Sequence, residues 1–121
     1  MNNRMFISGK ITGDEHYREK FDEAVNEVEL PSFGLEHTPV DYAMERGSII
    51  FFKAVNPCGF VILGRTMERW PWAVCMAYCL WRLTWCSWVY QLGDWKESRG
   101  ARIEHWWATV LGKRIVYQIE N

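Results

Sequence analysis

Two kinds of hydrophobic pattern alternate along the chain. Short apolar runs at residues 4–8, 48–55, 87–92 and 114–119 have the length and the β-branched or aromatic content of buried strands. Between them, residues 15–29, 72–85 and 100–111 carry apolar side chains at helical spacing. Alternating strands and helices predict a three-layer α/β sandwich, in which helices cover both faces of a small parallel sheet ordered 2-1-3-4.

The middle of the chain gives weaker signals. Pro31, Gly34, Pro39 and Gly47 interrupt residues 30–50, and only a short helix at residues 40–46 is predicted there. Residues 58–69 are apolar and broken by glycine, and no element is assigned to them. With 121 residues, the whole chain, 1–121, is expected to form one domain.

Composition adds one unusual feature, the abundance of tryptophan. A formal net charge of −1 and 49% hydrophobic residues are typical of a globular domain without a nucleic-acid footprint. There are eight tryptophans, and six of them lie between Trp70 and Trp95. This excess indicates a ring-binding pocket, an oligomer interface, or both, and we expect a homo-oligomer, most simply a dimer.

The apolar stretch at residues 70–92 raises the question of a membrane span. Pro71, Arg82 and Gln91 within it argue against one, as does its division into a helical half and a strand-like half. A signal peptide is not predicted either, because Asn2, Asn3 and Arg4 lead directly into a strand. We therefore expect a cytoplasmic protein.

The four cysteines have no spacing typical of a secreted disulfide framework, which fits a reduced compartment. Cys75 and Cys79 lie four residues apart on a predicted helix and could offer two metal ligands. No histidine or third cysteine has a matching position, so buried thiols are the favoured interpretation. No metal or other cofactor is expected.

Two loops at the carboxyl ends of predicted strands carry the candidate site residues. In the loop at residues 93–105, Ser98 can cap the following helix, Gly100 allows a ligand to approach closely, and Glu104 lies in the first helical turns. In the loop after residues 4–8, the run Ser8-Gly9-Lys10-Ile11-Thr12-Gly13 can present backbone N–H groups and a lysine to a phosphate. Ordinary surface turns often have the same composition, so this motif alone leaves both interpretations open.

The pattern Ser98-x-Gly100-x-x-x-Glu104 after a strand, together with the opening Phe6-Ile7-Ser8-Gly9-Lys10-Ile11-Thr12-Gly13, resembles the nucleoside 2-deoxyribosyltransferase-like superfamily. Within it, the chain is most similar to a small phage and bacterial branch of unknown function. The resemblance implies a flavodoxin- or Rossmann-like fold, with residues 30–50 as an insertion. It covers most of the chain and is weakest between about residues 30 and 72.

The resemblance also implies a nucleotide site. In the superfamily, the glutamate at the position of Glu104 attacks the anomeric carbon and displaces the base, and a serine at the position of Ser98 contacts a 5′-phosphate. The expected phosphate-binding residues are Ser8, Gly9, Lys10, Thr12, Ser98 and Gly100, and further candidates are Asn56 and Arg99. Without the resemblance, Glu104 would be interpreted as an exposed carboxylate favoured by the helix dipole.

Two departures from the superfamily weaken the enzymatic interpretation. Cys79 and Ser87 stand where its members carry aspartates, one of which assists departure of the base. Losing such an acid typically lowers the rate by two to four orders of magnitude. Tyr78 or Tyr90 could replace it, but packing roles are equally plausible for both.

The three histidines are weaker candidates for proton transfer. His16 lies beside the first loop and is the preferred one, and His37 falls in the unassigned middle. His105 adjoins Glu104 but points about a hundred degrees away around the helix, which favours a solvent or interface role.

Three functions remain open. The first is a hydrolase that cleaves the N-glycosidic bond of a nucleoside 5′-phosphate or nucleotide-like metabolite through Glu104. The second is a non-catalytic binding protein, such as a phage-type sponge for a nucleotide signal. The third is an aromatic-rich oligomeric interaction module.

Overall fold

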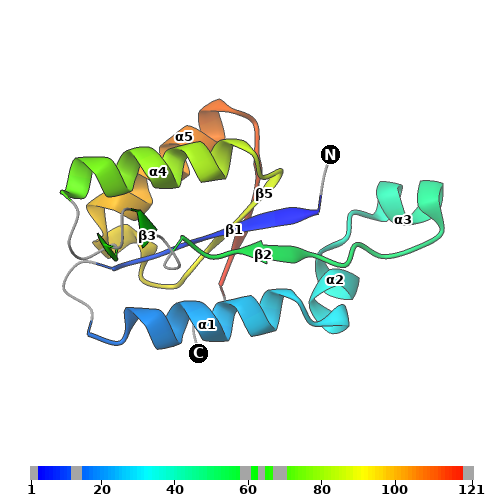
Figure 1. Ribbon diagram of the computed structural model, residues 1–121. Helices are drawn as coiled ribbons and strands as arrows, with labels where there is room; N and C mark the ends of the chain where they lie inside the picture. Colours follow the sequence, from blue (N-terminus) through cyan, green and yellow to red (C-terminus); the bar gives the residue numbers. More distant parts are fainter. Residues whose placement is uncertain (1–2, 12–14, 58–60, 63–64, 67–70, 119–121) are drawn as a thin grey trace.

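A four-stranded parallel sheet forms the centre of the computed structural model (Figure 1), which describes residues 3–11, 15–57, 61–62, 65–66 and 71–118. Its strands are β1 (Arg4–Ser8), β2 (Lys53–Val55), β5 (Trp88–Gln91) and β6 (Arg114–Tyr117), in the order β2-β1-β5-β6. All three strand pairs are parallel. The predicted fold class and the predicted order 2-1-3-4 are therefore confirmed.

Helices cover the sheet on both faces and complete the three layers (Figure 1). Helix α1 (Tyr17–Val28) covers one face, while α4 (Trp72–Thr84) and α5 (Arg99–Val110) cover the other. Each helix buries one stripe, which in α1 consists of Phe21, Ala24 and Val28.

Side chains alternate between the two faces along the central strands and so divide the core in two. Met5 and Ile7 of β1 join the cluster under α1, together with Trp88 and Tyr90 of β5. Phe6 joins the cluster under α4 and α5. Ser8 lies on the same face as Phe6 because the side-chain period of a strand is two.

The chain between β1 and β2 contains more helix than the sequence indicates. Helix α3 (Val40–Arg46) has the predicted bounds, but α2 (Pro31–His37) was not predicted. Pro31 occupies its first turn, where the missing N–H is tolerated, and a Cβ on Gly34 would lie 1.9 Å from the Ile50 carbonyl oxygen. Close packing of α2 on residue 50, and not backbone flexibility, therefore requires this glycine.

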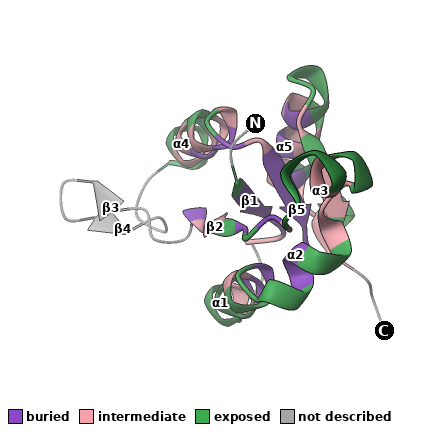
Figure 2. Ribbon diagram, turned by 90° about the vertical axis from the view of Figure 1, so that its right-hand side faces the viewer, coloured by how far each residue is buried: buried purple, intermediate pink, exposed green. Residues whose placement is uncertain are grey.

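Two short strands lie outside the main sheet. β3 (Val61–Ile62) and β4 (Arg65–Thr66) pair antiparallel in the region to which the sequence assigned no element. None of the helices formed by the described residues is long and apolar enough to cross a membrane. Figure 2 shows that the buried residues gather on the main sheet and the helix faces turned towards it.

Candidate functional site

A buried hydrogen bond joins the two candidate loops at the carboxyl edge of the sheet. Ser8 ends β1, and its Oγ donates to Oε1 of Glu104 on α5 over 2.8 Å. The two side chains are only 1% and 6% exposed. Glu104 is therefore a buried acid facing the end of the central strand, and the interpretation of an exposed helix-start carboxylate is wrong.

Burial changes the protonation of Glu104. Loss of solvent raises the pKa of its carboxyl from 4.5 to about 8, although hydrogen bonds from Ser8 and Cys79 act in the opposite direction. The group is accordingly mostly protonated at neutral pH. Cys79 of α4 itself is 5% exposed, so the position that departs from the superfamily pattern lies directly against Glu104.

Gln91 is a third polar side chain at this edge. It ends β5 in register with Ser8, so its side chain lies on the face of the sheet that also carries Ser8 and Glu104. Gln91 is fully buried, and among the described residues neither its Oε1 nor its Nε2 has a hydrogen-bond partner. A buried amide without partners typically costs about 1–3 kcal/mol, which marks a group available to a ligand.

The start of α5 forms the next part of the site. Ser98 caps the helix as predicted, because its Oγ accepts a hydrogen bond from the Ala101 backbone N–H over 3.2 Å. A Cβ on Gly100 would lie 3.2 Å from Met76 Sδ and 3.9 Å from Trp72 Nε1. The glycine thus permits close approach of α4 to α5, which is a packing role in addition to the predicted ligand role.

Arg99 faces an indole on α4. Its guanidinium carbon lies 4.8 Å from the centre of the Trp72 ring, in a cation–π contact. Both side chains are exposed. A cation and an aromatic ring therefore stand together next to Ser98.

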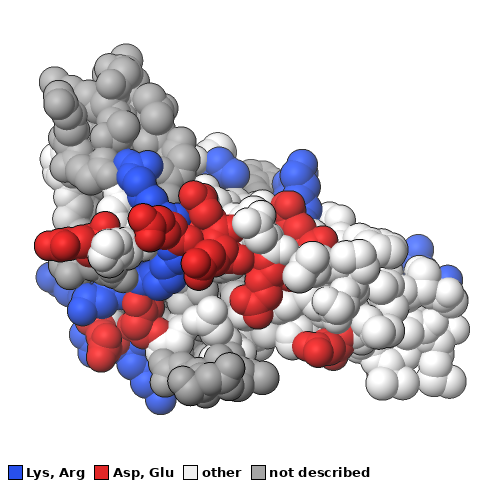
Figure 3. All heavy atoms as spheres, turned by 90° about the horizontal axis from the view of Figure 1, so that it is seen from below, with Lys and Arg blue, Asp and Glu red and all other residues white. Residues whose placement is uncertain are grey.

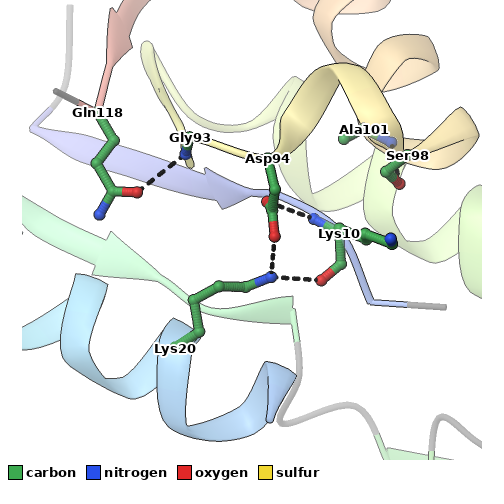
Figure 4. A network of polar contacts seen from close by, with 7 residues as sticks. All are labelled: Lys10, Lys20, Gly93, Asp94, Ser98, Ala101 and Gln118. Atoms are coloured by element: carbon green, nitrogen blue, oxygen red, sulfur yellow. Dashed lines mark hydrogen bonds and ion pairs between the residues drawn. The ribbon is translucent and has the colours of Figure 1, made fainter. Parts of the chain in front are cut away.

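Lys10 lies at a network that ties the two loops together (Figure 4). Its backbone N–H donates to Asp94 Oδ1 over 3.1 Å, and its carbonyl accepts from Lys20 Nζ over 2.8 Å. Lys20 also forms an ion pair with Asp94. The backbone groups of Lys10 are thus used internally, while its side chain points away from this pair towards the start of α5 (Figure 4).

Gly9 is required by packing between the loops. A Cβ at this position would lie 2.7 Å from Leu92 Cδ1 and 2.9 Å from Leu92 Cβ. Such contacts are too short for ordinary side chains. Thr12, the remaining predicted phosphate ligand, lies outside the described residues.

Three further candidates have hydrogen-bond or ion-pair partners of their own. His16 is 78% exposed before α1, with Nδ1 3.8 Å from Glu19 Oε2. Asn56 Nδ2 donates to Asp22 Oδ1 on α1 over 3.4 Å, and the Tyr78 hydroxyl accepts from Arg82 Nη1 over 2.8 Å. These contacts do not join the three residues to Glu104.

The remaining sequence candidates also point away from Glu104. The Tyr90 hydroxyl donates to Glu27 Oε1 over 3.0 Å beneath α1, and burial raises the pKa of that phenol. Ser87 precedes β5 at the opposite edge of the sheet. His37 packs on Phe33, and His105 stacks on Trp95 with ring centres 4.4 Å apart and bonds to the Tyr117 hydroxyl, consistent with its predicted direction.

Metal binding finds no support in the part of the chain that the structure describes. It contains no group of three or more histidine, cysteine, aspartate or glutamate side chains that could hold an ion. Cys75, Cys79 and Cys86 form no disulfide within the described part of the chain.

The residues that form this edge fall largely within a known family. A family model named "Domain of unknown function (DUF4406)" matches residues 37–117. The chain belongs to the DUF4406 family. Comparison with curated proteins and with solved structures found no match. The DUF4406 match includes Cys79, Gln91 and Glu104 but begins after β1, so Ser8 and Lys10 precede it.

Gln91 was not predicted as a site residue, because in the sequence it stands only as a polar interruption of an apolar run. The position of Gln91 at the end of an apolar strand could have indicated a site residue, since α/β proteins bind ligands at the carboxyl ends of their central strands. The strand register was needed to bring it next to Ser8.

Proposed function

We propose that this DUF4406 domain binds a nucleoside 5′-phosphate, or a related metabolite, at the carboxyl edge of the sheet. In this proposal Ser98, Gly100 and the Lys10 side chain hold the phosphate, and Glu104 faces the sugar. The resemblance to the deoxyribosyltransferase-like superfamily supplies the substrate class. The ligand would thus bridge the two loops that Ser8 and Glu104 join.

The observation that carries the proposal is the buried polar cluster of Ser8, Gln91 and Glu104. A neutral acid and an amide without partners are costly in an interior that could hold apolar side chains instead. Polar groups of this kind usually serve a ligand, and the ends of central parallel strands are the usual binding edge. Sugar hydroxyls can both donate to and accept from these side chains.

Hydrolysis of the N-glycosidic bond is the catalytic form of the proposal. Glu104 would attack the anomeric carbon, and the bond to the base would break with its electron pair leaving on the base, which takes a proton from solvent. Water would then hydrolyse the glycosyl ester, releasing the sugar phosphate and restoring the Glu104 carboxylate. Attack requires the ionised carboxylate of Glu104. The kcat/KM for release of the base should therefore increase as pH rises through about 8. Positive charge developing on the sugar would favour ionisation of the carboxyl.

A second candidate, binding without turnover, is favoured by one specific observation. The Cys79 thiol forms a hydrogen bond with the Glu104 carboxyl. In the superfamily, the position of Cys79 carries the acid that assists departure of the base. A neutral Glu104 beside a thiol can bind a sugar but lacks both a ready nucleophile and a strong acid. This domain would then retain its ligand intact.

Two substitutions test these forms of the proposal. Ser98→Asp should weaken nucleotide binding by about tenfold or more through charge repulsion. Aspartate is also a good N-cap, so α5 is preserved and the loss can be assigned to the ligand. Glu104→Gln should retain binding and abolish any release of base, with Glu97→Gln on the exposed loop as the control.

Binding is measured by calorimetry against a panel of nucleoside monophosphates, and released base by chromatography. Equal affinity of the wild type and Ser98→Asp for every ligand would contradict the phosphate site. Intact ligand after prolonged incubation with the wild type, at pH 7 and at pH 9, would favour binding without turnover.

Self-association is proposed as well. Four tryptophans remain 43% to 60% exposed on the helices, namely Trp72, Trp81, Trp85 and Trp106. Covering part of α4 with a second copy would remove apolar surface from water. A monomeric mass in light scattering at micromolar concentration would rule this out.

A further inference from the structure

A cavity lies at the amino edge of the sheet, opposite the edge that carries Glu104. It is open to solvent, has a volume of about 450 Å³, and lies between the starts of β1 and β2 and the end of α4. The described residues that line it are Arg4, Lys53, Ala54, Val55, Trp81, Arg82, Trp85 and Cys86. Its volume lies in the range of small-molecule sites, roughly 300–1,000 Å³.

The described lining contains three cations and no acidic residue. Arg4 and Lys53 are register partners on neighbouring strands, so their side chains leave the same face of the sheet side by side. The chain as a whole has a formal charge of −1. Local concentration of positive charge in a net anionic protein indicates an anion-binding surface.

A group of acidic side chains lies on the other face of the sheet, on α1. Figure 3 shows the face formed by α1, where Asp and Glu side chains cluster. Helix α1 contributes Glu19, Asp22, Glu23 and Glu27, all of them exposed. An anion is therefore repelled from the α1 face and attracted towards the cavity.

Arg82 is held in a defined position at the cavity wall. Its Nη1 donates to the Tyr78 hydroxyl over 2.8 Å, and its guanidinium carbon lies 5.7 Å from the centre of the Tyr78 ring. A guanidinium has five N–H donors, so this bond leaves others for a ligand. Pre-positioning lowers the entropy lost when an anion binds.

Two indoles supply the apolar part of the lining. Trp81 and Trp85 are one helical turn apart on α4 and remain 58% and 59% exposed. Exposed indoles beside cations form a surface on which a planar ring can stack while its anionic group meets the cations. Cys86 closes the wall but is 1% exposed, which leaves no accessible nucleophile there.

We propose that the cavity lined by Arg4, Lys53, Arg82, Trp81 and Trp85 is a second binding site, for a small molecule that combines an aromatic ring with a phosphate group. Arg4, Lys53 and Arg82 neutralise the phosphate, and the indoles stack on the ring. The site shares no residue with the carboxyl-edge site and does not depend on the function proposed for it.

The test uses adenosine monophosphate as the probe, with adenosine and inorganic phosphate as its two halves. Indole N–H signals of Trp81 and Trp85 are observed by NMR after labelling with ¹⁵N and are assigned from Trp81→Phe and Trp85→Phe. Both signals should shift with the monophosphate, and each half alone should bind at least tenfold more weakly. The measurement is repeated in Ser98→Asp, which should weaken binding at the carboxyl edge only. The shifts of the Trp81 and Trp85 signals should therefore be the same in this variant as in the wild type.

Lys53→Glu should weaken this binding by about tenfold or more, because it reverses a charge in the lining. Arg46→Glu, which makes the same charge change on α3, should have no effect. Trp81→Ala should weaken binding by roughly fivefold or more through loss of stacking.

Three results would overturn the proposal. The first is an absence of shifts at Trp81 and Trp85, and the second is an equal response in the wild type and Lys53→Glu. The third is binding of a single-stranded oligonucleotide but not of the monophosphate, which would make the cavity part of a polymer groove.

Discussion

The polar side chains at the two edges of the sheet differ in their exposure to solvent. At the carboxyl edge, Ser8, Gln91 and Glu104 are 0% to 6% exposed, and desolvation keeps the acid mostly neutral. At the amino edge, the side chains of Arg4 and Lys53 are exposed beside two exposed indoles. One fold thus supports hydrogen bonding to neutral groups at one edge and charge attraction at the other, and α4 contributes to both.

The largest expected effect is the pH dependence of stability in Glu104→Gln. The folded pKa of about 8 lies above the unfolded value of 4.5, so the neutral carboxyl stabilises the fold fully below pH 4.5, and this contribution is lost as pH rises through 8. Glutamine cannot ionise, so the variant should be more stable than the wild type by about 5 kcal/mol at pH 9. Urea unfolding at pH 4 and pH 9 measures this. An equal difference at both pH values would show that Glu104 is not desolvated.

The next effect concerns the tight packing at the carboxyl edge. Gly9→Ala places a Cβ against Leu92 and should lower the free energy of unfolding by about 1–3 kcal/mol. In a Leu92→Ala background the same change should cost less, because Cγ and Cδ1 of Leu92 are removed, although its Cβ, 2.9 Å from the added methyl group, remains. A double-mutant cycle by thermal unfolding checks the pair, and additive effects would contradict the contact.

Gln91→Leu should separate stability from binding. Removing a buried amide without partners should raise the free energy of unfolding by about 1 kcal/mol while weakening ligand binding at this edge. Gln118→Leu is the matched control, because the Gln118 Oε1 accepts from the Gly93 N–H over 2.9 Å and its loss should destabilise. A destabilised Gln91→Leu with unchanged binding would show that Gln91 has only a structural role.

The smallest effect is expected at the amino edge. Lys53→Glu and Trp81→Ser change exposed side chains and should alter the free energy of unfolding by no more than about 0.5 kcal/mol. Chemical denaturation measures both. Losses above 2 kcal/mol would mean that these residues hold the fold together, which would remove the contrast between the edges.

Elements were predictable from the sequence where a hydrophobic periodicity was bounded by residues that typically begin or end a helix. Ser98 marks the start of α5, and Gly112, at φ +71°, follows its end, so that helix was expected within about one residue of its observed bounds. Helix α2 was missed because proline and glycine usually interrupt helices, whereas Pro31 lies in a first turn and Gly34 packs against residue 50. Such tertiary contacts are not visible in a local pattern.

The candidate site was predictable only in part. The loops pointed to Ser8, Ser98 and Glu104, because residues after parallel strands meet at one edge. The burial of Glu104 and the partnerless amide of Gln91 depend on which face of the sheet each side chain joins, and this requires the register. The amino-edge cavity brings Arg4 and Lys53 together across 49 positions of sequence, and neither residue belongs to a motif.

The central position of β1 has a consequence for the order in which the protein assembles during synthesis. β1 lies between β2 and β5, and its partner Gln91 follows Ser8 by 83 residues. At a translation rate of roughly 5–20 residues per second, β5 is synthesised several seconds after β1. Until β5 is made, Met5, Phe6 and Ile7 therefore lack the strand that completes their side of the sheet.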